Sequence, residues 1–204
     1  ELSITITSNL SIDHNKMKNR FNKLNNLVKN KNIKKIHIIG SLDCWGPEAE
    51  YVRSGLDLSL WQKNFEYLLH NTECGLSVNS AWTPLTTKTY PNLVKKINEW
   101  NKVRRVYHSM MQAASSFGEY HPGMFGPWIL DQGMYKAYEM FETHNDPELT
   151  GYKDYFSGII KSIENTKEDK LAQHMMHSIL SELDRRRNVN YTSMWPEIYE
   201  KIHE

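Results

Sequence analysis

The sequence has little cysteine and no long hydrophobic run, and these two absences exclude several classes of protein. Only two cysteines, Cys44 and Cys74, occur among the 204 residues. That number is too small for a disulfide framework and suits a reducing compartment. No apolar stretch approaches the roughly 18 residues needed to cross a bilayer, and no signal peptide is visible. We therefore expect a cytoplasmic protein with no membrane partner.

An excess of charge of one sign is also missing. The formal net charge is +1, so no global field favours nucleic acid or a membrane surface. One local bias exists, because residues 14–42 contain eight Lys or Arg and no Asp or Glu. This composition is typical of a nucleic-acid surface and equally of the solvent side of an outer helix. We favour the outer helix because Phe21 is the only Phe, Tyr or Trp in the segment.

The first half of the chain alternates short β-like runs with helical patterns. The expected strands are Leu2–Thr7, Ile36–Leu42, Leu76–Ser80 and Val103–Met110. Helical spacing of apolar residues falls between them around Met17–Val28, Trp61–Leu69 and Pro91–Trp100, with Ser59 and Gln62 spaced as a capping box for the second helix. Strands and helices alternating at these lengths predict an α/β fold with right-handed crossovers and a parallel sheet.

The second half changes character near residue 112. Gln112 to Pro127 is rich in Gly, Pro and small residues, which predicts a long ordered loop. Helical patterns follow over Trp128–Phe141, Tyr152–Ile163 and Asp169–Arg185, and the last places Leu171, Met175, Ile179 and Leu183 along one face. We therefore expect two domains, residues 1–112 and residues 113–204.

A polar cluster directly after the second expected strand is the strongest site candidate. This loop holds Ser41, Asp43, Cys44, Trp45, Gly46 and Arg53. Ligands in α/β folds bind where strands end and helices begin, so a ligand site is expected here. A well hydrogen-bonded loop without a ligand is the alternative.

Several motifs, in order along most of the chain, resemble twitch-domain-containing members of the radical S-adenosylmethionine (radical SAM) superfamily. The motifs are Ile6–Leu10, Ser41-Leu42-Asp43 followed by Gly46, Glu50–Gly55, Asn64–Leu69, Leu183–Arg187 and Trp195-Pro196-Glu197. Each motif is of moderate specificity, and their order and spacing together are fairly specific.

The resemblance implies a fold, a cofactor and a reaction class. The fold is the C-terminal part of a partial (β/α)6 barrel with parallel strands, in which this chain supplies strands three to six, followed by a mainly helical, twitch-like extension. The cofactors are a [4Fe-4S] cluster and SAM, which the reduced cluster cleaves to a 5′-deoxyadenosyl radical that abstracts hydrogen from a substrate. A flavodoxin or ferredoxin would donate the electron, and the substrate would be a peptide or small molecule.

The sequence departs from this family at the cluster. Neither the C-x3-C-x2-C triad nor the Gly-Gly-Glu segment of the family is present. Cys44 and Cys74 lie too far apart in the chain to replace the triad. The chain also begins within an expected strand, so we expect the missing parts upstream of Glu1. This chain alone should therefore be inactive.

The resemblance also assigns roles to six residues. Ser41 and Asp43 would approach the ribose and amino acid moiety of SAM, and Arg53 would bind its carboxylate, which suits a guanidinium. Asn9, Asn79 and Ser80 end neighbouring strands and would line the same mouth. For each of these residues, a turn or cap role is the alternative. We expect no metal ligand in this chain.

Two other functions stay open. The chain could be a non-catalytic half-barrel that binds or assembles with a separate cluster-bearing subunit. A nucleic-acid-associated α/β protein is a weaker alternative, based on the basic segment. The resemblance does not fix a substrate, because one fold supports many reactions.

Overall fold

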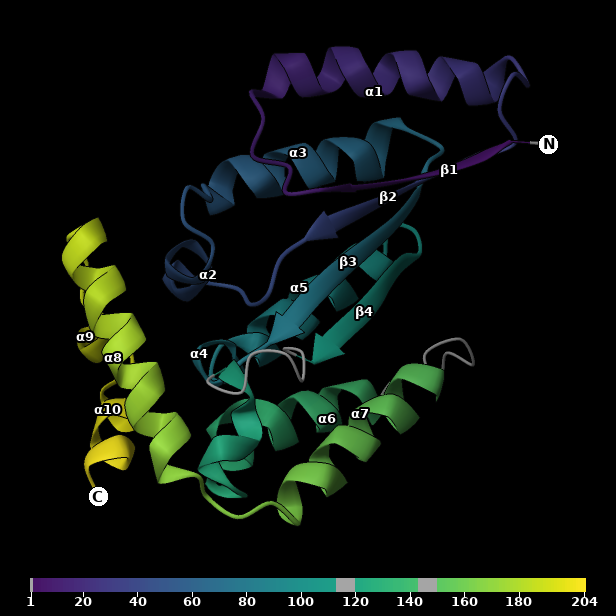
Figure 1. The fold of residues 1–204 in the computed structure, drawn as a ribbon. Helices are drawn as coiled ribbons and strands as arrows, with labels where there is room; N and C mark the ends of the chain where they lie inside the picture. The colour runs from purple at the N-terminus through teal and green to yellow at the C-terminus, as the bar shows by residue number, and fades with distance from the viewer. Residues whose placement is uncertain (1, 113–119, 143–149) are drawn as a thin grey trace. The chain divides into compact units, whose positions relative to one another are not determined.

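The computed structural model describes residues 2–112, 120–142 and 150–204. Within these residues the chain forms a four-stranded parallel sheet, and most of its other elements are helices (Figure 1). It divides into two compact units. Unit 1 is Glu1–Ala81 with Asn92–Met110, and unit 2 is Trp82–Pro91 with Met111–Glu204. One boundary, near residue 111, lies where the composition changes. Residues 82–91 also belong to unit 2, which the sequence did not indicate.

The sheet lies in unit 1, and its strands follow one another in chain order. The strands are β1 (Ser3–Ser8), β2 (Lys35–Ser41), β3 (Gly75–Trp82) and β4 (Val106–Gln112), and the order across the sheet is β1-β2-β3-β4. Ile38 lies opposite Ile6 of β1 and opposite Leu76 of β3. Because every strand runs the same way, all four carboxyl ends lie at one edge of the sheet.

The helices that connect these strands pack on one face of the sheet. They are α1 (His14–Lys29), the short α2 (Pro47–Val52), α3 (Leu58–Asn71) and α5 (Tyr90–Asn101). A Cβ on Gly40 of β2 would lie 2.8 Å from the Trp61 ring of α3. Trp61 stacks on Phe65 at 5.0 Å, and Phe65 contacts Trp100 of α5 at 4.6 Å. These rings, with α1 beside α3 (Figure 1), form the core of unit 1.

Side chains form hydrogen bonds at both ends of α3. Asp57 is the N-cap, and its carboxylate accepts a hydrogen bond from the Leu60 N–H at 2.9 Å. The expected capping box is wrong, because the Ser59 hydroxyl donates to Asp57 and Gln62 donates to Glu66. At the other end, the Arg104 guanidinium donates to the carbonyls of Leu68, Leu69 and Cys74. A cation therefore adds hydrogen bonds to carbonyl groups at and just beyond the C-terminus of α3, where the helix dipole favours positive charge.

The expected fourth strand begins too early in the sequence. Residues 103–105 precede the strand, Val103 is exposed, and β4 starts at Val106. The Asn101 side chain accepts a hydrogen bond from the Val106 N–H at 2.8 Å, which fixes where the strand begins.

Unit 2 is helical over its described residues. Its elements are α4 (Pro84–Thr87), η2 (Pro122–Phe125), the π-helical η3 (Leu130–Met134), α6 (Tyr135–Glu142), α7 (Thr150–Glu164), α8 (Lys170–Arg187), α9 (Tyr191–Met194) and α10 (Pro196–His203). The Phe156 ring of α7 contacts the rings of Trp82, Tyr90, Tyr138 and Phe141. Part of the expected loop, residues 113–119, lies outside the described residues.

Two features of unit 2 differ from the sequence expectation. The helix expected over Trp128–Phe141 is interrupted at Gly133, where φ is 149° and an added Cβ would lie 2.5 Å from the Thr87 carbonyl oxygen. On α8 the buried residues are Gln173, Met176 and Leu180, whereas Leu171 is 73% exposed and Met175 is 43% exposed. The expected stripe is wrong because Gln173, a polar residue, turns inward and donates to the Met124 carbonyl at 2.9 Å.

The close packing at Gly40 leads to a stability prediction. Gly40→Ala places a methyl group against buried rings and should lower the free energy of unfolding by about 1–3 kcal/mol. Gly158→Ala is the matched control: this exposed position in α7 has nothing within 4 Å of the new Cβ, so the substitution should raise stability by about 0.5–1 kcal/mol. Urea unfolding of both variants measures the difference. Equal effects would contradict the assigned packing.

Candidate functional site

The carboxyl ends of β2 and β3 meet at a buried carboxylate. Asp43 follows β2, and its Oδ1 accepts a hydrogen bond from the Ala81 N–H at 2.7 Å. The Leu42 N–H donates to the Asn79 carbonyl at 3.0 Å, which continues the pairing of the two strands past Ser41. The Asp43 side chain is 5% exposed. This carboxylate therefore joins the ends of two strands.

Arg53 neutralises that carboxylate. Its Nη2 donates to Asp43 Oδ1 at 2.8 Å, and its Nε lies 2.6 Å from Oδ2, an ion-pair distance that lacks a good hydrogen-bond angle. The Arg53 side chain is 31% exposed, so one side of the guanidinium faces away from Asp43. The Nη1 amino group donates to no described residue. Nη1 is therefore the part of this pair that can donate to a ligand.

The loop between β2 and α2 brings Arg53 back to the end of β2. Gly46 has a φ of 139°, which L side chains rarely adopt, and Pro47 follows at the first position of α2. Arg53 is the C-cap of this six-residue helix. The tight turn and the short helix return the chain to the end of β2. Arg53 therefore lies beside Asp43, although it follows Asp43 by ten positions.

Ser41 and Asn79 lie opposite each other on β2 and β3 and are both half-buried. Side chains alternate along a strand, and Gly40 faces the helices, so Ser41 and Asn79 project from the other face. We call this surface the polar face. It is the face of the four strands opposite α3, and it carries Thr5, Thr7, Lys35, His37, Ile39, Ser41, Ser77, Asn79 and Tyr107.

Ser80 does not lie on the polar face. It is fully buried on the helix side, where its hydroxyl donates to the Leu42 carbonyl at 2.6 Å. That bond uses the Ser80 proton, so the His108 Nε2–H at 3.1 Å donates to the Ser80 oxygen. Burial lowers the pKa of His108 to about 3, which keeps this imidazole neutral. Alternation thus separates Ser80 from its neighbour Asn79.

Asn9 lies beyond the end of β1 and is exposed. Its side-chain oxygen accepts a hydrogen bond from the Ser11 N–H at 3.2 Å, which is an Asx turn. The turn role considered from the sequence is therefore present. The Asn64 amide of α3 holds the same loop by donating to the carbonyls of Leu10 and Ile12.

The cysteines do not form a ligand set. Cys44 and Cys74 are both buried, and burial raises the pKa of the Cys74 thiol. Within residues 2–112, 120–142 and 150–204, no three His, Cys, Asp or Glu side chains gather in a way that could hold a metal ion. Of the helices in those same ranges, none has both the length and the apolar character needed to cross a membrane.

Sequence reasoning missed a second polar group on the polar face. His37 Nε2 lies 2.5 Å from Ser77 Oγ, and its ring lies 6.0 Å from the Tyr107 ring. The signal was present as alternation in β2, where Ile36, Ile38 and Gly40 are buried and the intervening residues are not. These residues lie inside the strands, whereas the sequence argument considered only strand ends.

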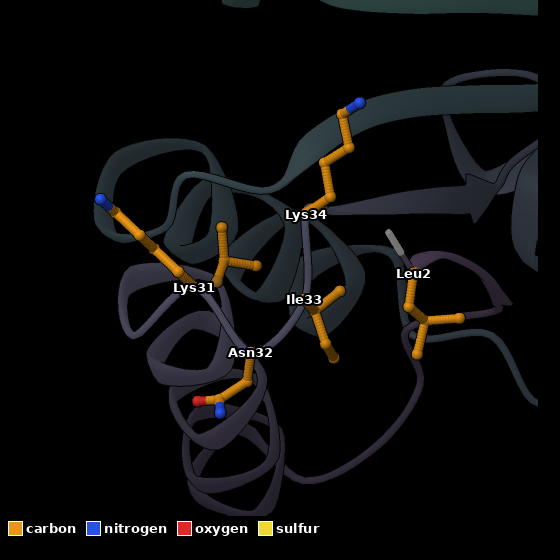
Figure 2. Close-up of a pocket in the computed structure, with 6 residues that line it drawn as sticks. Leu2, Lys31, Asn32, Ile33 and Lys34 are labelled. Carbon is orange, nitrogen blue, oxygen red and sulfur yellow. The ribbon is translucent and has the colours of Figure 1, made fainter.

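Two hollows lie elsewhere on unit 1. One of about 420 Å³ lies at the turn between α1 and β2, at the opposite edge of the sheet, and is lined by Leu2, Val28, Lys31, Asn32, Ile33 and Lys34. Figure 2 shows that the two lysines point away from Ile33. The other hollow, of about 290 Å³, is lined by Trp45, Asn92, Lys95, Lys96 and Glu99. Two of its lining residues contact each other, since Lys96 Nζ lies 5.5 Å from the centroid of the Trp45 ring.

Comparisons of the chain with protein-family models, curated proteins and solved structures found no match.

The Asp43–Arg53 pair gives a prediction on stability. Asp43→Asn leaves a half-buried guanidinium without its charge partner and should lower the free energy of unfolding by about 2 kcal/mol. Arg53→Gln should lower the free energy of unfolding by a similar amount. The loss in the double variant should be smaller than the sum of the two single losses by at least about 1 kcal/mol. Glu204→Gln, which removes the pair of a 63% exposed carboxylate with Lys201, is the control and should cost less than about 1 kcal/mol. Additive losses would show that the two side chains do not interact.

The buried His108 gives a prediction on pH. Its pKa is about 3 in the folded chain and close to the ordinary histidine value of 6.5 in the unfolded chain, so between these values the unfolded chain binds the proton and the folded chain does not. Stability from this group is complete above pH 6.5 and falls as pH decreases toward 3, by up to about 1.4 kcal/mol per pH unit. In urea unfolding measured over a pH series, the free energy of unfolding of His108→Gln should lack this part of the dependence on pH. Identical slopes would contradict a neutral buried imidazole.

Proposed function

We propose that this chain forms part of the barrel of a radical SAM enzyme and supplies part of its SAM and substrate pocket. The proposal rests on the sequence resemblance, and one structural observation supports it: four parallel strands stand in chain order, with their connecting helices on one face and polar side chains on the other. The sequence motifs that resemble the superfamily lie at the carboxyl ends of these strands and in the helices behind them.

Strand order distinguishes this proposal from a dinucleotide-binding fold. A doubly wound sheet reverses its strand order and so has helices on both faces, with ligands at the reversal. This sheet has no reversal among β1 to β4. Right-handed crossovers in one direction place every helix on the same side, which is how a (β/α) barrel is built. The polar face then corresponds to the inside of the barrel.

The residues at the strand ends differ in whether they can contact SAM directly. Ser41 and Asn79 project from the polar face and can bond to the ribose or the amino acid moiety. Arg53 can reach the SAM carboxylate through Nη1. Both Asp43 oxygens are already engaged by Arg53 and the Ala81 N–H, so we assign Asp43 as a positioning residue that aims the guanidinium. Ser80 supports the strand end from the core side.

The described residues do not suit the [4Fe-4S] cluster. Its ligands are thiolates, and the two thiols here are buried and not gathered with further ligands. The cluster and its electron donor therefore belong to protein outside this sequence. When bound there, the reduced cluster would supply the electron that cleaves SAM to methionine and a 5′-deoxyadenosyl radical. The residues of this chain bind and orient SAM and substrate.

We propose that further protein attaches at the unpaired side of β1. β1 is an edge strand, and its even-numbered residues Ile4 and Ile6 are half-buried although no described strand pairs beyond them. Edge strands of this kind readily pair with another strand. The added strands come either from the same polypeptide or from a separate cluster-bearing subunit, in which case this chain is a binding module.

The test is SAM cleavage by the chain joined to its upstream coding sequence, reconstituted anaerobically with iron and sulfide. We expect 5′-deoxyadenosine after reduction, and we expect Asn79→Ala to raise the KM for SAM about tenfold, since it removes a hydrogen-bonding side chain beside SAM. Ser178→Ala, an exposed serine of unit 2, is the control and should leave KM unchanged.

Two outcomes decide between the alternatives. If the upstream sequence has no C-x3-C-x2-C segment but a separate protein bearing one restores SAM cleavage, the binding-module form of the proposal holds. If neither arrangement yields 5′-deoxyadenosine, the radical SAM proposal is wrong.

A further inference from the structure

The free edge of β1 leaves apolar side chains uncovered on the helix side of the sheet. Ile4 and Ile6 lie opposite Ile36 and Ile38 of β2 in the parallel register, and those two β2 residues are buried on the helix side. Ile4 and Ile6 therefore project toward the helices as well, yet both are only half-buried. Leu2, directly before β1, is 60% exposed. No described strand pairs with β1 on this edge.

The hollow of about 420 Å³ lies at the amino end of the same strand. Its apolar lining is Leu2, Val28 and Ile33. Lys31 and Lys34 also line it, and both point away from Ile33 (Figure 2). A side chain of another protein that enters this hollow would therefore contact apolar groups, with positive charge nearby.

Helix α1 carries a stripe of three cations. Lys16, Arg20 and Lys23 follow one another at spacings of four and three residues, and Leu27 comes four residues later. Side chains at these spacings lie on one side of a helix. All four residues are exposed, and an exposed leucine at the end of a cationic stripe is an apolar contact without a described partner.

The stripe lies on the side of α1 that faces away from α3. On the α3 side, Asn22 accepts a hydrogen bond from the Tyr67 hydroxyl at 2.8 Å, and Lys18 Nζ lies 5.1 Å from the centroid of the Tyr67 ring. Arg20 follows Lys18 by two residues, which is about 200° around a helix. Because the strand order is β1-β2-β3 and α3 follows β2, the side of α1 away from α3 lies toward the free edge of β1.

No described carboxylate neutralises the stripe. Among residues 2–112, 120–142 and 150–204, no Asp or Glu forms an ion pair with Lys16, Arg20 or Lys23. Helix α1 itself contains no acidic residue. Asp13, directly before it, caps the helix by accepting from the N–H groups of Asn15 and Lys16 at 3.1 and 3.0 Å. We call Lys16, Arg20, Lys23 and Leu27, with the hollow beside Leu2, the α1 flank.

We propose that the α1 flank binds an acidic helix of the protein that pairs with β1. Carboxylates spaced three and four residues apart on that helix pair with Lys16, Arg20 and Lys23, and an apolar side chain enters the hollow. Complementary charge of this kind selects partners and suppresses wrong ones. A second copy of this chain fits poorly, because its own α1 flank would bring cations against cations. The inference rests on the proposed attachment at β1 and adds the chemistry of the partner.

The test uses a synthetic amphipathic helical peptide as the probe. Its Leu stripe is bordered by Glu at spacings of three and four residues, and two matched peptides carry Gln or Lys in place of Glu. Each peptide is titrated into the 204-residue chain labelled with nitrogen-15. We expect saturable amide shifts in α1 and β1 with the Glu peptide, about tenfold weaker binding of the Gln peptide and no binding of the Lys peptide.

Variants on α1 separate the stripe from general charge. The double variant Lys16→Gln with Lys23→Gln should weaken binding of the Glu peptide about fivefold. Lys29→Gln is the matched control, because Lys29 is an exposed lysine of the same helix that lies off the stripe. It should leave the affinity unchanged. Higher salt should weaken binding of the Glu peptide, since the charges are exposed.

Several results would overturn the inference. They are equal binding of the Glu and Gln peptides, shifts outside α1 and β1, no saturation, or a loss with Lys29→Gln as large as with the double variant. Dimerisation of the chain through β1 without peptide, measured by analytical ultracentrifugation, would make a second copy the occupant. SAM and the cluster take no part in this titration, so SAM cleavage without peptide binding would overturn the acidic partner alone.

Discussion

The packing of α1, α3 and α5 on a single face of the sheet is the constraint on which the rest of unit 1 depends. Trp61 and Phe65 lie so close to the sheet that β2 needs a glycine beneath them. Alternation along each strand then assigns every residue to one of two environments. Ile38, Leu76 and Ser80 enter the core, and the residues between them form the polar face.

The same constraint explains the different roles of neighbouring polar residues. Ser80 and Asn79 are adjacent in sequence, yet Ser80 supports the strand end from within the core and Asn79 projects from the polar face. Asp43 and Arg53 lie ten residues apart, yet they act as one group because α2 returns the chain to the end of β2. The chemistry of this edge therefore depends on pairs of residues rather than on single side chains.

Two groups of polar side chains occupy opposite ends of the polar face. At the strand ends, Ser41, Asn79 and Arg53 suit a ligand with hydroxyl and carboxylate groups. Nearer the strand beginnings, His37 contacts Ser77 and Tyr107 across three strands. Both groups of contacts lie on the polar face, because alternation along the strands turns these side chains away from the helices.

The sequence by itself determined the alternation of strands and helices, the parallel α/β class of unit 1 and the change to helices near residue 112. These follow from apolar periodicity, which is local. Apolar periodicity predicts most element ends to within a few residues. It fails where a hydrogen bond to one partner sets an element's end or its buried face, as at Asp57 of α3, Asn101 before β4 and Gln173 on α8. Only the tertiary structure decided that Asp43 engages Arg53, that Ser80 faces His108 and that His37 meets Ser77 and Tyr107. Each of these contacts joins residues ten or more positions apart, and strand register and crossover geometry, rather than local preference, bring them together.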